Sequence, residues 1–148
     1  MPVIIRKATE ADIQAIFELI KAFAAFQQTP EKVFVTPEQM KADKELFQCF
    51  VAEEISTTEI VGFASFFFAC YSWSGKALYL DDLYVKEAFR KQNIGSMLMN
   101  SVIDFAKANN CKKLRWQVSN WNTNAQAFYK KLGAIIDDVE INCDLVLQ

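Results

Sequence analysis

Two adjacent acids stand inside an otherwise apolar run of the chain. Asp81 and Asp82 interrupt the stretch from Leu78 to Val85. A carboxylate in a partly dry cleft has a raised pKa and can act as a base or bind an amine. Strict strand alternation would turn one acid toward apolar surroundings, whereas a β-bulge would splay the strand and place one carboxylate in a cleft. The alternative is one exposed acid and one structural acid.

A polar and basic turn follows this run and leads into an apolar helix. It contains Arg90, Lys91 and Asn93, and Gly95 stands at the start of the helix. Free N–H groups and the helix dipole attract anions here, Asn tolerates left-handed backbone, and Gly permits close approach. The pattern is neither a P-loop nor GxGxxG. It predicts a site for a phosphate-bearing ligand, with a solvated turn as the alternative.

Composition excludes several classes of chemistry. The chain has 148 residues, of which 52% are hydrophobic, and this predicts a single domain (1–148) with a packed core. A net charge of -2 with interspersed signs argues against non-specific nucleic-acid binding and a polybasic membrane patch. Without histidine, neither a Cys/His zinc site nor Ser-His or Cys-His catalysis is possible. We expect no metal, and acid–base work must come from carboxylates, Tyr, Cys, Lys or water.

The spacing of the cysteines and the length of the apolar runs indicate where in the cell the protein is expected. The four cysteines are far apart, form no CxxC pair, and are predicted to be buried free thiols in a reducing compartment: Cys49, Cys70, Cys111 and Cys143. The first residues do not resemble a secretory signal, and the interrupted run 60–73 is too short for a membrane helix. We therefore expect a cytoplasmic protein.

The elements that position these groups follow from periodicity and capping signals. The predicted strands are 3–6, 49–53, 60–71, 77–85, 113–118, 134–136 and 141–147. Helices are predicted after N-caps at Thr9 and Thr36, over 94–108, and from Asn122 or Thr123 to Gly133. This order predicts an α/β (α+β mixed) fold, a mixed sheet with helices on both faces. Its ligand site would lie where neighbouring strands splay.

Two segments together resemble a known family. Residues 84–98 are similar to the acetyl-CoA motif of the GNAT superfamily of N-acetyltransferases, Gln/Arg-x-x-Gly-x-Gly/Ala. Residues 118–134 are similar to its second motif, Asn-x-x-Ala/Ser-x-x-Phe-Tyr-x-x-x-Gly-Ala/Phe. Periodicity alone places Tyr129 in the core of its helix. The resemblance covers nearly the whole chain and is closest to the diamine (spermidine/spermine and thialysine) acetyltransferases.

The resemblance implies the GNAT acyl-CoA N-acyltransferase fold, with a largely antiparallel sheet splayed between its strands 4 and 5, and acetyl-CoA as co-substrate. It implies that Tyr129 protonates the departing thiolate and that Asp81 contacts the amine and helps to deprotonate it. The implied cofactor residues are Leu83, Tyr84, Val85, Arg90, Lys91, Gln92, Asn93, Ile94, Gly95, Ser96, Asn122, Ala125 and Tyr129. The implied substrate residues are Phe26, Gln27, Asp81, Asp82, Arg115, Trp116 and Gln117. A homodimer is expected by the same analogy.

The sequence departs from the family pattern at two places. Asn93 replaces the first motif glycine, and Phe26-Gln27 replaces a Tyr-Glu pair, which lowers the negative potential available to a polycation. We therefore expect direct acetyl transfer to a primary amine of a small molecule, diamine/polyamine- or thialysine-like. The alternatives are a non-catalytic acyl-CoA-binding regulatory module and a protein or peptide N-acetyltransferase.

Overall fold

The computed structural model describes residues 2–147, and it divides between Trp116 and Gln117 into two compact units. The first unit is built on a five-stranded sheet in the order β1-β2-β3-β4-β5. The strands are β1 (Val3–Lys7), β2 (Gln48–Glu54), β3 (Ile60–Tyr71), β4 (Gly75–Val85) and β5 (Leu114–Arg115). β1 to β4 pair antiparallel and β5 runs parallel to β4, which confirms the mixed, largely antiparallel sheet.

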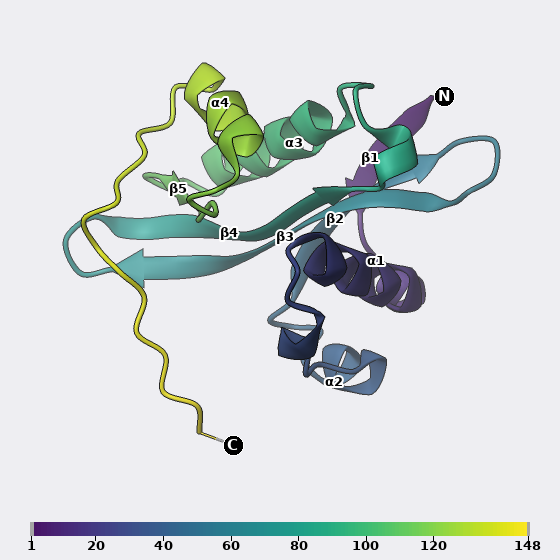
Figure 1. Ribbon diagram of the computed structural model, residues 1–148, viewed down its shortest axis with the longest axis horizontal. Helices are drawn as coiled ribbons and strands as arrows, with labels where there is room; N and C mark the ends of the chain where they lie inside the picture. Colours follow the sequence, from purple (N-terminus) through teal and green to yellow (C-terminus); the bar gives the residue numbers. More distant parts are fainter. Residues whose placement is uncertain (1, 148) are drawn as a thin grey trace. The chain divides into compact units, whose positions relative to one another are not determined.

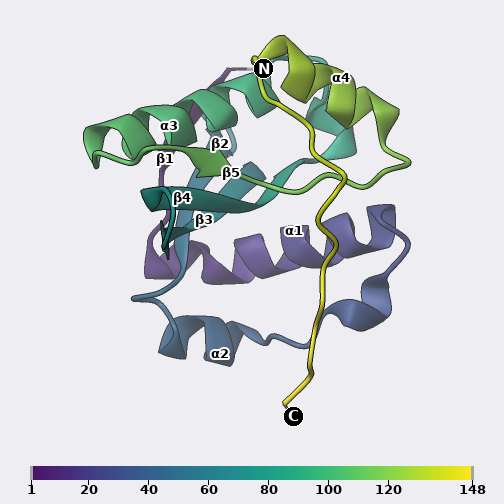
Figure 2. The same cartoon turned by 90° about the vertical axis from the view of Figure 1, so that its left-hand side faces the viewer.

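Helices cover both faces of this sheet (Figure 1). α1 (Ile13–Phe26) lies on one face and α3 (Ile94–Ala108) on the other. Figure 2 shows the layers in order, with α2 (Pro37–Ala42) beyond α1. The 3-10 turns η1 (Glu10–Asp12), η2 (Pro30–Lys32) and η3 (Glu87–Phe89) complete this unit. The predicted arrangement of helices on both faces is confirmed.

Local signals explain where these helices begin. Thr9 and Asp12 form the predicted capping box, in which the Asp12 carboxylate accepts the Thr9 N–H at 2.7 Å. Thr36 accepts the Gln39 N–H at 3.1 Å, as expected for an N-cap. The apolar stripe of α1, including Ile16, then packs with Val51 and Phe63 of the sheet. This core fixes α1 across β2 and β3, and β3 is the strand that pairs with the acid-bearing β4.

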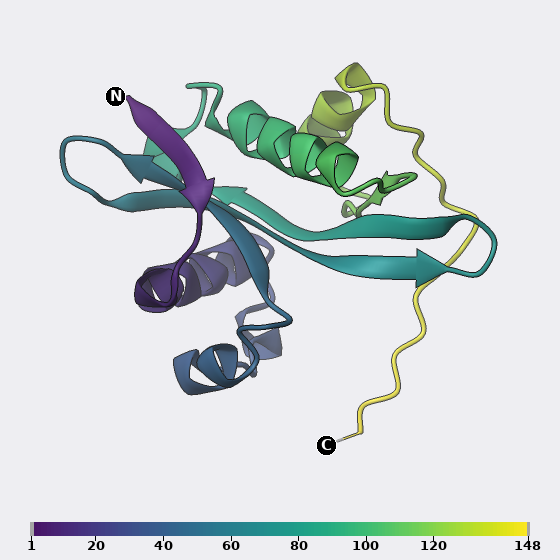
Figure 3. The ribbon, with the colours of Figure 1, turned by 180° about the vertical axis from the view of Figure 1, so that it is seen from behind.

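β4 is splayed from β5. The two strands pair only through Leu78 with Leu114 and Tyr79 with Arg115. Within the described residues, the part of β4 from Leu80 to Val85 therefore has no strand on its β5 side. In the other direction, β3 and β4 continue as a long hairpin (Figure 3). The predicted splay between strands 4 and 5 is confirmed.

The second unit contains α4 (Thr123–Lys131) followed by an irregular segment. The strands predicted at 134–136 and 141–147 are wrong, because residues 134–147 contain no helix or strand. Their apolar side chains are exposed, Ile135 at 94% and Leu147 at 87%. Alternating apolar residues form a strand only where a neighbour accepts the backbone hydrogen bonds. The strand predicted at 113–118 shortens to Leu114–Arg115 for the same reason.

The cysteines are free, as predicted, but their predicted burial is partly wrong. Cys49 is buried, Cys111 is half-buried, and Cys70 and Cys143 are exposed. Cys70 lies on the β3–β4 hairpin and Cys143 in the irregular segment, where no layer covers them. Among residues 2–147, no helix has the length and apolar character needed to span a membrane.

Candidate active site

A β-bulge in β4 sets the position of the two acids. Asp82 is opposite Ser65 and Leu80 is opposite Phe66, so Asp81 is the extra residue with no counterpart on β3. The Asp82 N–H donates to Ser65 Oγ at 3.2 Å, and Ser65 is almost fully buried. The bulge breaks the alternation of a regular strand. The bulge expected as one possibility from the adjacent acids is therefore confirmed.

Both acids of the bulge hold their protons more tightly than usual. Burial raises the pKa of Asp82 to about 7, and the nearby charge of Asp81 adds to this effect. Burial also raises the pKa of Asp81, although its side chain retains more contact with solvent. Within residues 2–147, neither carboxylate accepts a hydrogen bond or forms an ion pair. The pair is therefore poised to exchange protons or to bind a cation.

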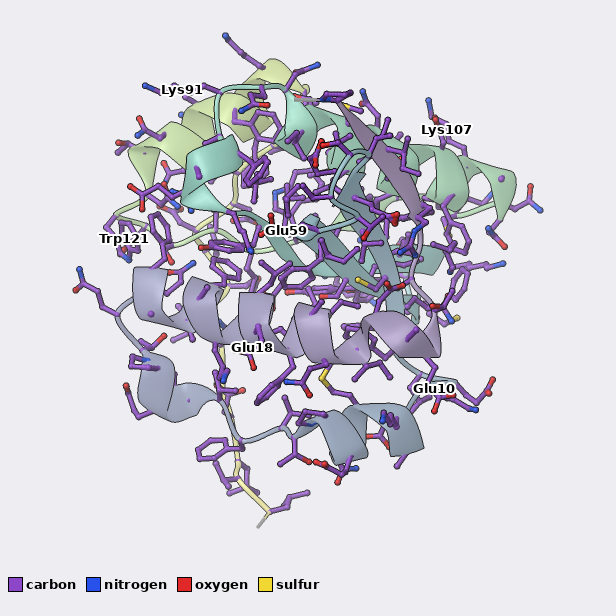
Figure 4. The ribbon with its side chains drawn as sticks, turned by 90° about the vertical axis from the view of Figure 1, so that its right-hand side faces the viewer. Glu10, Glu18, Glu59, Lys91, Lys107 and Trp121 are labelled. Atoms are coloured by element: carbon purple, nitrogen blue, oxygen red, sulfur yellow. The ribbon has the colours of Figure 1, made fainter. Side chains whose placement is uncertain are left out.

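The β4–α3 turn (residues 86–93) presents backbone donors. Lys91 and Asn93 adopt left-handed backbone with φ of 64° and 67°. The first helical hydrogen bond runs from the Met97 N–H to Asn93 O, so the N–H groups before it have no acceptor in the helix. A Cβ atom at Gly95 would meet no atom within 4 Å, which leaves this backbone open to a ligand. Lys91 lies exposed on the same turn (Figure 4). The turn suits an anion such as a pyrophosphate.

The open edge of β4 connects the acids to this turn. The Lys86 N–H donates to Val61 O on β3. Because backbone groups alternate in direction along a strand, the N–H and C=O of Leu83 and Val85 point to the side without a strand. Tyr84 pairs with Phe63 instead and stacks on Phe23 of α1, with 5.2 Å between ring centres. The Leu83 N–H and C=O and the Val85 N–H can pair with an extended ligand.

Arg90 does not extend freely from the turn. Its Nε donates to Val85 O at 3.0 Å, and its guanidinium carbon lies 4.7 Å from the ring centre of Phe26 and 5.4 Å from that of Tyr84. Cation–π contact of this kind fixes the side chain over the end of α1. The structure thus brings a predicted cofactor residue, Arg90, against a predicted substrate residue, Phe26. Gln27 follows as the C-cap of α1.

Arg115 and Trp116 end the first unit. Arg115 is exposed on β5 beside Tyr79, its partner in register, and Trp116 is half-buried. Gln117 belongs to the second unit, where its Nε2 donates to Asn142 Oδ1 at 2.6 Å. The three predicted substrate residues are therefore divided between the two units.

The remaining predicted residues lie together on α4. Asn122 is the N-cap, and its Oδ1 accepts the Ala125 N–H at 3.2 Å. Ala125 and Tyr129 are four residues apart and share a helix face. Tyr129 is only 9% exposed, and burial raises its pKa, so it keeps its proton at neutral pH. Gly133 ends this segment with φ of 91°. The predicted boundaries of α4 are confirmed.

Sequence reasoning missed three residues that shape the site. Ser65 anchors the bulge, Phe23 supports Tyr84, and Tyr79 lies between Asp81 and Arg115 along the sheet. Ser65 could have been identified from the sequence, since it is a polar residue inside the apolar run 60–71. The contacts of Phe23 and Tyr79 join distant segments, and periodicity does not report such contacts.

Comparison with known proteins agrees with this geometry. Residues 13–134 match the Acetyltransferase (GNAT) family. The chain is 34% identical over 142 residues to thialysine N-epsilon-acetyltransferase of Bos taurus, across 89% of this chain and 84% of the relative. It is 31% identical over 140 residues to spermidine/spermine N(1)-acetyltransferase-like protein 1 of Homo sapiens, across 88% of this chain and 20% of the relative. A possible acetyltransferase from Clostridium difficile 630 shares the fold with a TM-score of 0.79 and 19% identity, across 100% of both chains. The chain belongs to the GNAT family of acetyltransferases.

Proposed function

We propose that this acetyltransferase transfers the acetyl group of acetyl-CoA directly to the primary amine of a small molecule. The observation that carries the proposal is the acid pair at the β4 bulge. Its carboxylates accept no hydrogen bond from residues 2–147, and it lies on the strand whose open edge leads to the proposed anion-binding turn. Amine N-acetyltransferases among the relatives support the same substrate class.

The residues present suit acetyl-CoA. The N–H groups of Ile94, Gly95 and Ser96 would bind the pyrophosphate, with Lys91 nearby. The backbone groups of Leu83 and the N–H of Val85 would pair with the pantetheine arm. Bound acetyl-CoA supplies the thioester that the amine attacks. Asn122 and Ala125 would border the rest of this arm. Arg90 would hold the turn against α1 rather than bind phosphate with its side chain.

The acid pair would prepare the amine. A free primary amine has a pKa of ~10.4 and must lose a proton before it attacks. Asp81 would contact the ammonium and help to remove its proton through water. Asp82, with a pKa of about 7, would help to hold that proton in the pair. A coupled pair releases protons as a unit, so its apparent pKa values belong to both residues.

Tyr129 would act as the general acid. A thiolate with a reference pKa of ~8.5 departs more readily when it is protonated. The raised pKa of Tyr129 keeps its hydroxyl proton available for this transfer. No covalent enzyme intermediate is needed. If Tyr129→Phe keeps full kcat at its pH optimum, this assignment is wrong.

A homodimer and a cytoplasmic location are further proposals. Exposed apolar side chains in the irregular segment, among them Ile141 and Leu145, support self-association, because a second copy would remove them from water. Light scattering on the purified chain tests the dimer. A monomer at micromolar concentration would contradict it.

The test of the function is CoA thiol release with a panel of primary amines, comparing wild type with Asp81→Asn. We expect release with small amines and a large loss in the variant. Acetyl-CoA binding without release for any amine would contradict the proposal and support a regulatory module. Release with peptides alone would assign a protein substrate.

A further inference from the structure

The β3–β4 hairpin ends in a fully exposed tryptophan. Tyr71 pairs with Gly75, and the three residues between them form a turn with Trp73 at its centre. Gly75 has φ of 83°, the left-handed backbone that is common in three-residue hairpin turns. Trp73 is 100% exposed. Figures 1 and 3 show the hairpin extending beyond α1 and α3, so the helices of the first unit do not cover its tip.

Cations lie behind this tip on both faces of the hairpin. Lys76 Nζ is 5.1 Å from the ring centre of Phe68. Lys113 Nζ is 4.6 Å, and the Arg115 guanidinium carbon 4.5 Å, from the ring centre of Tyr71. Because Phe68 and Tyr71 are three residues apart on one strand, their side chains point to opposite faces. Cation–π contact therefore holds positive charge on each side of the hairpin.

Backbone hydrogen bonds bring a fourth cation to the same place. The Lys112 N–H donates to Lys76 O at 2.8 Å, and Lys113 O accepts the Leu78 N–H at 3.1 Å. These bonds hold residues 112–115 beside the start of β4. The four cations, here called the basic collar, are Lys76, Lys112, Lys113 and Arg115. Within residues 2–147, none of them forms an ion pair, so their charges are available to an external anion.

The charge at this end of the sheet is of one sign. Residues 67–80 and 109–116 contain four of the chain's 16 basic residues and none of its 18 acidic residues. The net charge of -2 conceals this concentration, because the two segments are distant in sequence and only the fold brings them together. A local positive potential of this kind attracts an anionic partner.

The aromatic residues distinguish between anionic partners. A single-stranded nucleic acid stacks its bases on free aromatic rings, but Phe68 and Tyr71 have cations against their rings, and Trp73 alone of the three is fully exposed. A second copy of the chain would bring a second basic collar to this surface and be repelled. A membrane matches both features, since Trp favours the interface and Lys and Arg bind anionic headgroups.

We propose that the β3–β4 hairpin docks end-on to an anionic membrane surface, with Trp73 among the headgroups and the basic collar against their negative charges. Cations on both faces suit this orientation, because both sides of the hairpin then reach the headgroups together. β4 runs from Gly75 at the tip to Val85 at the opposite end, so docking by the tip keeps the β4–α3 turn away from the membrane. The inference does not depend on the proposed amine acetylation.

Co-sedimentation with lipid vesicles tests the proposal without any amine. We expect wild type to bind vesicles of phosphatidylserine and phosphatidylcholine in equal amounts, and to bind pure phosphatidylcholine far more weakly. Salt near 1 M should release the chain, because screening shortens the Debye length to about 3 Å. Lys112→Gln together with Lys113→Gln should weaken binding about 25-fold, at about fivefold for each cation. Trp73→Ser should weaken it about 10-fold, because an apolar ring no longer leaves water.

Matched control variants lie elsewhere on the first unit. Lys41→Gln together with Lys44→Gln removes two exposed lysines at α2 and its C-terminal end. Phe34→Ser removes a ring that is 88% exposed in the segment before α2. Both controls should bind the anionic vesicles as wild type does. Equal midpoints of thermal unfolding would show that the hairpin variants and the controls are folded alike.

Three results would overturn the inference. They are no binding to the anionic vesicles at low salt, equal binding to the two kinds of vesicle, and equal losses of binding in the hairpin and control variants. A fourth measurement adds poly(U) RNA to wild type. Binding of this RNA without binding of vesicles would assign the basic collar to nucleic acid and would also overturn the inference.

Discussion

Two sets of acids in the first unit have opposite surroundings. The Asp12 carboxylate accepts Arg6 Nη1 at 2.8 Å and Nη2 at 2.9 Å, and hydrogen bonds from Arg6 are the main reason that its pKa is lowered. Glu54 is 1% exposed, and hydrogen bonds from Thr57 and Ser56 lower its pKa to about 2. Asp81 and Asp82 have no such donors in the described part of the chain, and burial raises the pKa of both.

The contrast separates structural acids from functional ones. Donors placed around Asp12 and Glu54 stabilise the charged form, so their ionisation favours folding. At the β4 bulge no side chain or backbone group of residues 2–147 donates to either carboxylate, and ionising Asp82 opposes folding because burial raises its pKa. Residues that destabilise the folded protein in this way are often retained because they take part in binding or catalysis.

The largest expected effect is on catalysis. Asp81→Asn should lower kcat/KM for amines by about 100-fold or more, because it removes the contact and the proton acceptor in the pair. Thiol release measures the effect. Asp104→Asn, an exposed acid on α3, is the control and should match wild type. Unchanged kcat and KM in Asp81→Asn would place this acid among the structural ones.

The second effect is a gain in stability. Asp82→Asn should raise the free energy of unfolding above pH 7, because wild type loses stability as pH rises from the unfolded pKa of ~3.9 through about 7. The variant should show no loss from this group across that window. Urea unfolding at pH 5 and pH 8 measures the difference. A variant that is less stable than wild type at pH 8 would mean that the Asp82 carboxylate is satisfied.

The third effect has the opposite sign. Asp12→Asn should lower the free energy of unfolding by about 1–3 kcal/mol, since it leaves the Arg6 guanidinium with Glu53 as its remaining carboxylate. Urea unfolding at pH 7 measures the loss. Below the unfolding transition, kcat should stay at the wild-type value. If Asp12→Asn is as stable as wild type but has a reduced kcat, Asp12 is a functional acid and not a structural one.

The smallest effect appears at low pH. Because the pKa of Glu54 is lowered, its contribution to stability is present above the unfolded pKa of ~4.3 and is lost as pH falls toward about 2. Glu54→Gln should therefore flatten the acid limb of stability against pH. Thermal unfolding between pH 2 and pH 6 tests this. If the variant loses stability at low pH as steeply as wild type, groups other than Glu54 cause the loss.

Sequence patterns predict a helix or strand well where the residues of that segment alone determine its structure. The bounds of β3 and α3 follow from a long apolar run and from capping residues. The strand predicted at 141–147 fails because pairing depends on a neighbour that periodicity does not reveal. Similarly, the adjacent acids suggested a bulge, but the position of Asp81 as its extra residue depends on the register against Ser65.

The roles of individual residues can likewise be predicted where they depend on residue type, and not where they depend on contacts between distant residues. The left-handed Asn93 follows from residue type, since Asn is among the few residues that accept this backbone. The contact of Arg90 with Phe26 joins residues far apart in sequence, and a local pattern cannot report it. The division of the predicted site residues between the two units is likewise a property of the fold.

The central claim is that the acid pair at the β4 bulge accepts the proton of the amine. The pH dependence of kcat/KM for wild type and Asp82→Asn, with one small amine as acceptor, tests it most directly. For wild type we predict an acid limb with an apparent pKa near 7 that belongs to the pair. In Asp82→Asn this limb should shift to lower pH, since Asp81 then titrates without a neighbouring carboxylate. An acid limb unchanged by Asp82→Asn would contradict the account.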